Sequence, residues 1–389
     1  MSEKCTFTVP DYYPTFACKE GECRRSCCQG WPISMSMPEY FRLLGVDCSP
    51  ELRRRLDTGL HLAENPAPER YAQLLPDWRG DCPLHRDDGL CSLHAELGET
   101  ALCDICRLYP RSPRRITQPE CACSNSCERT LELLFARPEP LSFIQMELPF
   151  AAPEAPSGLP EPCRRFSALR HICMDLIQDR SRPLAERVAA IGSALKRLQP
   201  GFAALDESAI ESALEDIPEP EAVAPDEKFA LSFLAHFNRA VGLESHSVHD
   251  YAAHAIEWLG LEGEEPDEAA LERYRRAKAR FKARYAEWEV WFEHVLANHI
   301  FYESFPFSDR HEGVWDEYLS LAAVYGYFAF LAVTWTDARG GEAALVDVIA
   351  AAFRLIDHSA FDYNAAFILD ARMKVTESQM GGFVRGVMA

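Results

Sequence analysis

Apolar residues recur at helical spacing through the C-terminal half of the chain. Between residues 181 and 198 five apolar side chains follow the order i, i+4, i+7, i+11 and i+14, namely Leu184, Val188, Ile191, Leu195 and Leu198. This order places them on one helix face, with Ser181 able to cap the helix and Pro183 in its first turn. Similar patterns predict helices over residues 227–241, 248–259, 315–336 and 343–357. The C-terminal half is therefore predicted to be an all-α helical bundle.

One long helix is predicted after Pro266, where aromatic residues form a stripe. Its members are separated by seven, four, three, four and three positions and are Tyr274, Phe281, Tyr285, Trp288, Phe292 and Val295. These spacings keep all of them on one wide helix face. We interpret the stripe as part of the bundle core, with stacking against a cofactor as the alternative.

The first 136 residues show no comparable periodicity, because prolines and glycines interrupt the apolar positions. Helices are predicted there only over residues 37–60 and 128–135. Seven prolines lie between Arg137 and Cys163, a composition that cannot hold a helix and predicts an extended connector. The fold class is therefore predicted as mainly α. We divide the chain into a cysteine-rich, loop-rich metal-binding domain over residues 1–136, a proline-rich connector over 137–163 and a helical bundle domain over 164–389.

Composition restricts the class of partner. The 389 residues carry a net charge of −20, which disfavours nucleic-acid binding, since phosphate contacts need an excess of lysine and arginine. The same charge would attract a basic protein or peptide. No apolar stretch approaches the roughly 20 residues needed to cross a bilayer, because the longest, near residues 319–333, is broken by Gly326. The first 30 residues contain no apolar run of signal-peptide length, so a soluble cytoplasmic protein without nucleic-acid or membrane partners is expected.

All fifteen cysteines lie in the first 173 residues, most of them in closely spaced clusters. Reduced thiols at such spacing predict metal ligation, whereas a disulfide framework belongs to small secreted domains. The adjacent Cys27-Cys28 pair and the Cys103-x2-Cys106 pair suit thiolate ligation of zinc or an iron-sulfur cluster better than pairwise bridging. We therefore favour metal ligation over disulfides or inert buried thiols.

Several common sequence signatures are absent. The chain has no G-x-G-x-x-G after a predicted strand, no G-x-x-x-x-G-K-[ST], no H-E-x-x-H and no G-x-S-x-G. The radical-SAM arrangement Cys-x3-Cys-x2-Cys is also missing, because Gly30 and Thr130 stand where a third cysteine would follow Cys23-x3-Cys27 and Cys123-x3-Cys127. The chain thus lacks the usual Rossmann and hydrolase signatures, and its spacing does not indicate radical cleavage of S-adenosylmethionine.

The order of residues around the thiols is more specific than any single pair. The chain reads Cys18-x4-Cys23-x3-Cys27-Cys28-x-Gly30-Trp31, then Cys82-Pro83-Leu84, Gly89-Leu90-Cys91, Cys103-x2-Cys106-Arg107-x-Tyr109-Pro110-Arg111 and Ser126-Cys127. This order resembles the flagellin lysine-N-methylase family. The resemblance extends into the bundle, where Asn298, Phe301 and Phe305-Pro306-Phe307 are similar to a segment of that family and His358 is placed similarly.

The resemblance implies S-adenosylmethionine-dependent methylation of lysine side chains on a protein, flagellin in the family's name, by an enzyme that carries an iron-sulfur cluster. Nine cysteines fall on the shared pattern and are the candidate metal ligands: Cys18, Cys23, Cys27, Cys28, Cys82, Cys91, Cys103, Cys106 and Cys127. A [4Fe-4S] cluster takes four thiolates, which leaves thiols for a zinc site or spare thiols, and zinc is the alternative metal. The other cysteines are interpreted as incidental, namely Cys5, Cys48, Cys121, Cys123, Cys163 and Cys173.

Methyl transfer to lysine requires a neutral amine held in line with the sulfonium methyl group. Tyr109, beside the Cys103 and Cys106 pair, is the candidate catalytic residue. Arg107 and Arg111 flank it and are the candidate cofactor-binding residues, since a guanidinium group can pair with the carboxylate of S-adenosylmethionine. Equally, both arginines could offset the negative charge of a thiolate-bound cluster while Tyr109 only packs.

Other polar residues are further candidates. Asp316 and Glu317 could receive a lysine ammonium, although acidic residues in a first helical turn more often stabilise the helix. His85 and His94 lie among the thiols and could replace a cysteine ligand or lie in solvated loops. The bundle histidines are interpreted as core or surface residues, namely His294, His299 and His358.

Three functions are consistent with these features. The leading hypothesis is a protein-lysine methyltransferase whose acidic surface attracts a lysine-bearing substrate. The second is an iron-sulfur or zinc-binding module without transferase activity, and the third is a scaffold whose bundle recruits a partner. Binding of S-adenosylmethionine separates the first hypothesis from the other two.

Overall fold

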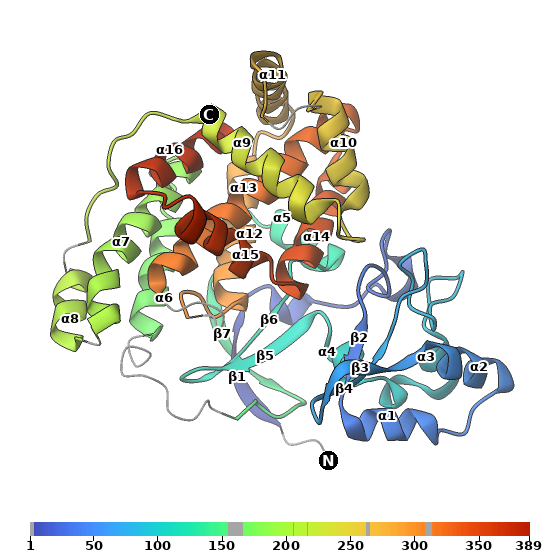
Figure 1. Cartoon of the computed structure of the whole chain (residues 1–389). Coiled ribbons are helices and arrows are strands. Elements are labelled where there is room, and N and C mark those ends of the chain that lie inside the picture. The colour runs from blue at the N-terminus through green and yellow to red at the C-terminus, as the bar shows by residue number, and fades with distance from the viewer. Residues whose placement is uncertain (1–3, 155–165, 205, 216, 262–264, 308–312) are drawn as a thin grey trace.

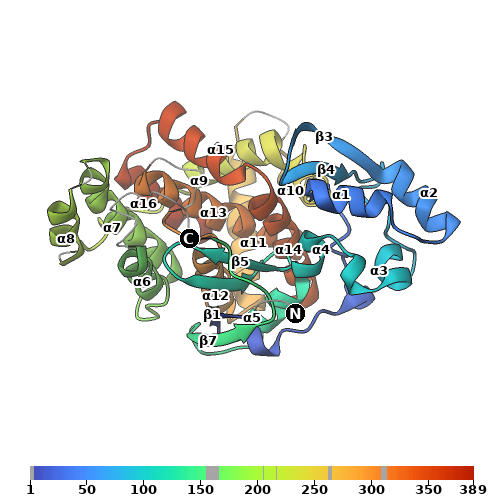
Figure 2. The same ribbon diagram turned by 90° about the horizontal axis from the view of Figure 1, so that it is seen from below.

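The computed structural model describes residues 4–154, 166–204, 206–215, 217–261, 265–307 and 313–389. A helical bundle lies above a four-stranded sheet, and a smaller lobe with a three-stranded sheet lies to one side (Figure 1). Seen from below, helix α2 (Pro50–Gly59) of the small lobe lies at one end of the molecule and helix α8 (Glu207–Glu215) at the other (Figure 2).

The four-stranded sheet joins strands from distant parts of the chain. Its order is β5-β6-β1-β7, with bounds Arg111–Arg115, Pro119–Cys123, Cys5–Pro10 and Phe143–Leu148. Strand β1 runs parallel to β6 and antiparallel to β7. Phe7 and Val9 alternate along β1 and are fully buried, so this face of the sheet enters the main core.

The two sheets correct the prediction of a loop-rich N-terminal part. Strand β5 reads Arg-Ser-Pro-Arg-Arg and carries no alternation of apolar and polar residues, so nothing in its pattern indicated a strand. Strand β7 lies inside the predicted connector, where residues 143–148 are extended but paired with β1. Beyond the sheets the described chain is mainly helical, as predicted. The predicted domain boundaries stay a prediction.

The small lobe surrounds a second antiparallel sheet. Its strand order is β2-β4-β3, with bounds Ile33–Met35, Arg70–Leu74 and Leu60–Ala67. Four short helices cover it, namely α1 (Met37–Leu44), α2, α3 (Ser92–Leu97) and α4 (Asp104–Leu108). Leu43, Leu56, Ala72 and Leu93 form its own small core, which also contains Cys82 and Cys103.

The helix predicted over residues 37–60 is wrong as a single element. It is two helices, because Gly45 ends α1 and a new start follows at Ser49, whose side chain accepts a hydrogen bond from the Leu52 amide at 3.2 Å. Pro50 then occupies the first turn of α2, where its missing N–H costs nothing. The break turns the chain back toward the sheet of the small lobe.

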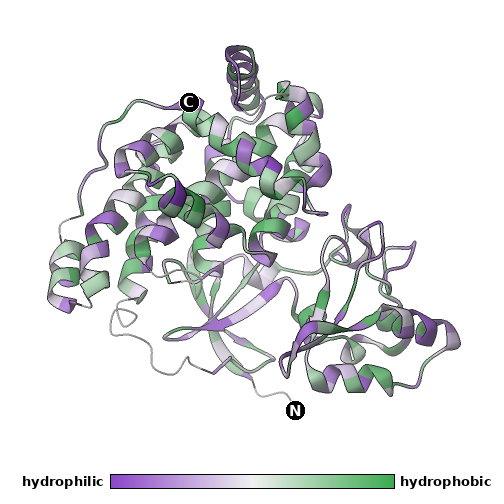
Figure 3. Ribbon diagram, in the orientation of Figure 1, coloured by the Kyte–Doolittle hydropathy of each residue, from purple (hydrophilic) through white to green (hydrophobic). Residues whose placement is uncertain are grey.

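The bundle confirms most of the helices predicted from periodicity. Those predicted correctly are α5 (Glu128–Phe135), α7 (Leu184–Ala204), α9 (Glu227–Phe237), α10 (His249–Leu259), α13 (Val314–Ala338) and α14 (Glu342–His358). The others in the bundle are α6 (Phe166–Ile177), α8, α11 (Glu268–Arg284), α12 (Trp288–Tyr302), α15 (Phe361–Phe367) and α16 (Glu377–Met388). Most of these helices carry both hydrophobic and hydrophilic residues (Figure 3).

The single long helix predicted after Pro266 is also wrong, since α11 and α12 are separate. The chain breaks at Tyr285, whose hydroxyl donates to the Gly341 carbonyl at 3.0 Å and accepts from the Gly341 amide at 3.1 Å. This contact with the turn before α14 fixes Tyr285 outside either helix. The stripe itself is buried, from Tyr274 on α11 to Val295 on α12, which confirms its interpretation as core.

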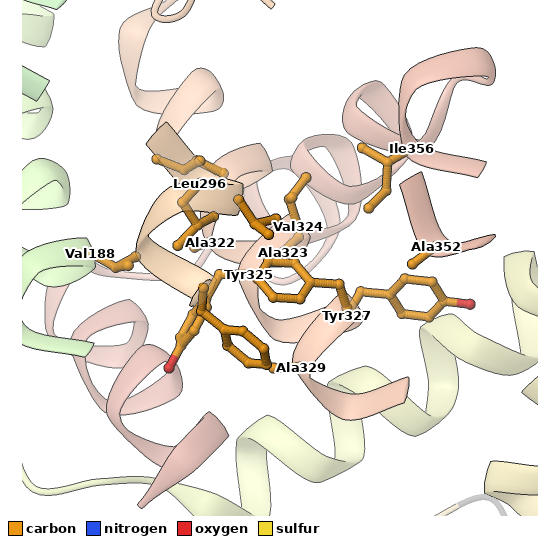
Figure 4. Close-up of a cluster of buried hydrophobic side chains, with 14 of the residues drawn as sticks. Val188, Leu296, Ala322, Ala323, Val324, Tyr325, Tyr327, Ala329, Ala352 and Ile356 are labelled. Atoms are coloured by element: carbon orange, nitrogen blue, oxygen red, sulfur yellow. The ribbon is translucent and has the colours of Figure 1, made fainter. Parts of the chain in front are cut away.

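Helix α13 runs through the centre of the bundle. By length and composition it is apolar enough to cross a bilayer, so the expectation that no stretch reaches spanning length is wrong. However, 94% of its most apolar window is buried inside the protein, and core helices commonly pass the same test. Tyr325 and Tyr327 of α13 pack there among side chains that include Leu296 of α12 and Ile356 of α14 (Figure 4). The apolar character of α13 is explained by this packing.

Candidate functional site

Five thiols of the small lobe and its border form one interacting group. The pKa of Cys82 and that of Cys103 are each raised to about 12, mainly by burial and in part by Cys91. Desolvation also raises the pKa of Cys106, and so do four neighbouring thiols. We call this group the lobe thiols, and it consists of Cys27, Cys82, Cys91, Cys103 and Cys106.

The loops of the small lobe bring these thiols together. The Cys82 amide donates to the Cys28 carbonyl at 2.7 Å, which joins two cysteine clusters that lie far apart in the sequence. His85 and Cys91 form an isolated β-bridge, and Cys103 is the residue that precedes helix α4. Both Cys28 and Cys91 pack against the small core. Four segments of the chain therefore converge on one side of the lobe.

Three further thiols lie at the border with the bundle. We call them the loop thiols, and they are Cys18, Cys23 and Cys127. Burial raises the pKa of Cys23 to about 12, with contributions from Glu128, Cys127 and Cys18. Cys127 precedes helix α5, and its pKa is raised by burial and by Cys27. Cys27 thus interacts with both groups of thiols.

An ion-pair network holds the loop thiols against the bundle. The buried Glu128 carboxylate accepts a hydrogen bond from the Arg24 amide at 2.9 Å and pairs with Lys19. The Arg24 guanidinium also pairs with Asp347 of α14 at 2.8 Å. The segment between Cys18 and Cys27 is therefore tied to α5 and α14 at once.

The thiols suit a soft metal by their chemistry. All cysteines that the structure describes are free, so disulfides do not compete for them there. Within the same residues, no three His, Cys, Asp or Glu side chains are already drawn together closely enough to hold a metal ion. Charge interactions such as those among the lobe thiols act over longer distances than metal–ligand bonds do. Ligation would draw these side chains closer.

The cysteines interpreted as incidental lie mostly elsewhere. Cys121 and Cys123 are buried on β6 and Cys173 is buried on α6, all three within the main core. Cys5 begins β1, and Cys48 packs against the small core between α1 and α2. Cys163 lies outside the described residues.

Tyr109 lies where the small lobe meets the bundle. Its ring centroid is 5.6 Å from that of Trp31 and 6.2 Å from that of His358 on α14. Its hydroxyl lies 3.0 Å from the Ser126 hydroxyl, within hydrogen-bond distance. Burial raises the pKa of Tyr109, and Cys127 raises it further. The candidate catalytic residue is therefore close to the thiols and to the bundle.

The two candidate cofactor-binding arginines point to other groups. Arg107 is exposed and pairs with Asp104 at 2.7 Å. The Arg111 guanidinium lies over the Phe16 ring, 4.9 Å from its centroid. A third guanidinium, that of Arg354 on α14, lies 5.3 Å from the Trp31 ring and donates to the Arg25 carbonyl at 2.9 Å. It is Arg354 that faces Tyr109 and lowers the pKa of that residue.

Behind Tyr109 lies a set of polar side chains that we call the polar junction. Asn298 of α12 accepts a hydrogen bond from the Tyr12 hydroxyl at 2.8 Å and donates to the Cys123 carbonyl at 2.9 Å and to Asn125 at 2.8 Å. The Ser124 hydroxyl donates to Asp357 of α14 at 2.5 Å. The members of the polar junction are Ser124, Asn125, Ser126, Asn298 and Asp357.

A charged group adjoins the polar junction inside the bundle. His299 Nδ1 lies 3.6 Å from Asp357 Oδ1, a distance for an ion pair rather than a hydrogen bond. Burial lowers the pKa of His299, but Asp357, Asp362 and Glu303 raise it, and the net shift is upward. Glu303 also pairs with Arg114 at 3.4 Å. The carboxylates therefore favour a positively charged His299.

The remaining candidates lie at other places. Asp316 and Glu317 stand in the first turn of α13. His85 lies in a loop of the small lobe, whereas His94 is exposed on helix α3 rather than in a loop. His294 is buried, and its Nδ1 lies 2.9 Å from the Leu134 carbonyl. The neighbours of Tyr109 are instead Trp31, Ser126 and His358.

Sequence reasoning missed much of the polar junction. Ser124, Asn125 and Asp357 drew no attention, because single serine, asparagine and aspartate residues are common in loops and at helix ends. His299 was interpreted only as core or surface. A signal was present for Asn298 and Ser126, since both belong to the segments that carry the family resemblance.

Comparisons with known proteins match this chain in part. A family model described as FliB lysine N-methylase C-terminal domain matches residues 170–369. The lysine-N-methylase of Salmonella typhimurium is 28% identical over 111 residues, which are 28% of this chain and 27% of that protein. The flagellar biosynthetic protein FliU of Salmonella muenchen is 27% identical over 111 residues, which are 28% of this chain and 64% of that protein. The chain thus matches less than two thirds of either relative. No solved structure matches.

Proposed function

Because the chain belongs to the FliB lysine N-methylase family, we propose that it transfers a methyl group from S-adenosylmethionine to lysine side chains of a protein. The observation that carries this proposal is the match over residues 170–369, which include Asn298, His299 and Asp357. The Salmonella typhimurium relative is named for methylation of lysine, which supports lysine as the acceptor.

Flagellin is the proposed substrate. The name of the Salmonella muenchen relative refers to flagellar biosynthesis. The family resemblance also points to flagellin. The net charge of −20 favours encounter with a lysine-bearing surface, since opposite charges accelerate association. A cytoplasmic location is part of the proposal, because free thiols persist in a reducing compartment.

The chemistry requires that the lysine lose a proton before it attacks. A lysine ammonium has a pKa of about 10.4, so at neutral pH the amine must be deprotonated in the site. In this proposal the hydroxyl of the half-buried Tyr109 accepts a hydrogen bond from such an amine, beside the aromatic rings of Trp31 and His358. Arg107 and Arg111 stay candidates for the carboxylate of S-adenosylmethionine.

A metal cofactor belongs to the proposal, with a [4Fe-4S] cluster favoured and zinc as the alternative. Four of the lobe thiols would hold it, and the nine candidate cysteines include all five of them. A bound cluster would supply iron that can accept a further ligand and would fix the converging loops of the small lobe. The loop thiols and Cys28 would then be spare thiols or ligands of a second metal.

The alternative function is a metal-binding module without transferase activity. The mutual interactions of the lobe thiols favour it, because they need no methyl donor. Two measurements on anaerobically purified protein distinguish the two functions. The absorption spectrum with metal analysis identifies iron-sulfur or zinc, and calorimetry with S-adenosylmethionine measures binding of the donor.

The decisive test is transfer itself. The metal-loaded protein is incubated with S-adenosylmethionine and unmethylated flagellin, and the product is analysed by mass spectrometry. We expect lysine residues that gain one or more methyl groups. A metal-loaded protein that binds no S-adenosylmethionine and methylates no lysine would leave only the metal-binding module.

A further inference from the structure

A continuous row of hydroxyl groups connects Tyr109 with the inside of the bundle. The Tyr109 hydroxyl lies 3.0 Å from Ser126 Oγ, which lies 2.5 Å from Ser124 Oγ. Ser124 in turn donates to Asp357 Oδ2 at 2.5 Å. Each hydroxyl can donate one hydrogen bond and accept others, so a proton can pass along the row without movement of heavy atoms.

The residues at the outer end of this row are partly exposed, whereas the side chains at its inner end are buried. Tyr109 is half-buried and His358, 3.2 Å from Ser126 Oγ, is exposed. Ser124 and Ser126 are fully buried, and the side chain of Asp357 is 1% exposed. A group that donates a proton at Tyr109 would thus be linked to a carboxylate that water does not reach.

The inner end retains capacity for a proton. Asp357 Oδ1 faces His299 Nδ1 at 3.6 Å, and neither atom has a hydrogen-bond partner within the described residues. Other ionisable groups surround this pair, namely Arg114 on β5, Tyr302 at the end of α12, Glu303 directly after it and Asp362 on α15. Burial disfavours the charged form of a carboxylate, so Oδ2 of Asp357, to which Ser124 donates, can accept the relayed proton.

We propose that Ser126 and Ser124 relay the proton of the substrate lysine from Tyr109 to Asp357. The proposal rests on the proposed lysine methylation and adds the route by which the amine is deprotonated. Tyr109 touches the substrate, whereas the two serines and Asp357 act through it as positioning residues.

An N–H bond of the lysine ammonium breaks and its proton binds the Tyr109 oxygen, while the Tyr109 proton moves to Ser126. The Ser126 proton moves to Ser124, and the Ser124 proton binds the Asp357 carboxylate, which becomes neutral. The lone pair of the neutral amine then forms the N–C bond as the S–C bond of S-adenosylmethionine breaks, and its electrons remain on sulfur.

The first test is the pH dependence of flagellin methylation by the full, metal-loaded chain. We expect Ser126→Ala to lower the rate about 100-fold at pH 7.5, a typical loss for a proton-transfer step. Near pH 10 solvent deprotonates lysine, whose ordinary pKa is about 10.4, so the variant should approach the wild-type rate. A purely structural loss would persist at all pH values, and a Ser126→Ala profile parallel to that of the wild type overturns the relay.

Ser193→Ala is the matched control. Ser193 is also buried and donates to a carboxylate, that of Glu377, at 2.6 Å, far from Tyr109. Its rate and pH profile should equal those of the wild type. Asp357→Asn, which keeps the volume but not the proton acceptor, should repeat the Ser126→Ala profile; a wild-type profile for Asp357→Asn contradicts the proposal.

A second measurement needs no methyl transfer. In protein labelled with ¹³C at tyrosine Cζ, Tyr109→Phe identifies the Tyr109 signal. Asp357→Asn should shift that signal in the wild-type background but not in the Ser126→Ala background. If Asp357→Asn shifts the Tyr109 signal in neither background, the hydroxyl row does not connect Tyr109 with Asp357, even if flagellin is methylated. A shift without any methylation by the wild type refutes the proposed function and the relay's role in it.

Discussion

Replacing Asn298 with alanine tests whether the bundle holds the end of β6 in place. The side chain is fully buried and makes three hydrogen bonds, to Tyr12, Cys123 and Asn125. A buried hydrogen bond contributes about 1 kcal/mol net, so their loss should lower the free energy of unfolding by about 3 kcal/mol. Tyr12 keeps its bonds to Cys123, at 3.1 Å from the amide and 3.3 Å to the carbonyl, which limits the loss.

The assay is urea denaturation followed by circular dichroism, combined with amide hydrogen exchange. Asn238→Ala is the matched control, because Asn238 is also fully buried and makes two hydrogen bonds, with Ala252 and Tyr327. Asn238→Ala should lower the free energy of unfolding by about 2 kcal/mol but leave amide hydrogen exchange in residues 123–127 unchanged. Asn298→Ala should accelerate exchange in that segment. A loss below about 1 kcal/mol for Asn298→Ala would refute the assigned role.

Three further outcomes are expected. If the proposed [4Fe-4S] cluster is bound, Cys106→Ala should abolish its retention on anaerobic purification, and unchanged iron content would remove Cys106 from the candidate ligands. Because the pKa of His299 is raised above its ordinary 6.5, its pairing with Asp357 stabilises the fold fully below pH 6.5 and less as pH rises through the folded-state pKa. His299→Gln should flatten this decline in urea titrations, and an unchanged decline would contradict the assignment. Glu293→Gln should lower the free energy of unfolding by about 3 kcal/mol, because the buried Arg187 charge loses its carboxylate partner at 2.6 Å. A decrease below about 1 kcal/mol, measured by calorimetry, would contradict this role of Glu293.

Periodicity was sufficient for the helices that pack by one apolar face. Helix α14 was predicted nearly to its ends, because its apolar residues recur without interruption. The break at Tyr285 was not predictable, since it depends on a contact with Gly341, 56 positions later in the chain. Strands β5 and β6 were not predictable either, because their sequences are rich in proline, arginine and cysteine and do not alternate apolar with polar residues. Tertiary contacts decided these elements.

The same physical limit applies to the candidate site. Spacing identified thiols that are close in sequence, such as Cys103 and Cys106, but not which clusters meet in space. The contact between Ser124 and Asp357 spans 233 positions, and the sequence does not show that the two residues meet. Tyr109 was found because it stands beside a cysteine pair, whereas its partners Ser126 and Arg354 required the fold.

The polar junction explains how a helical region without the thiol clusters can govern chemistry near them. The family match covers residues 170–369, whereas Tyr109 and the candidate ligands all precede it. Asn298 and Asp357, inside the match, hold Cys123 and Ser124, and the same short segment leads to Cys127 at the start of α5. Any shift of α12 relative to α14 must therefore move Ser126 and Cys127 together. The bundle therefore anchors the short segment that carries Ser126, the partner of Tyr109, to Cys127.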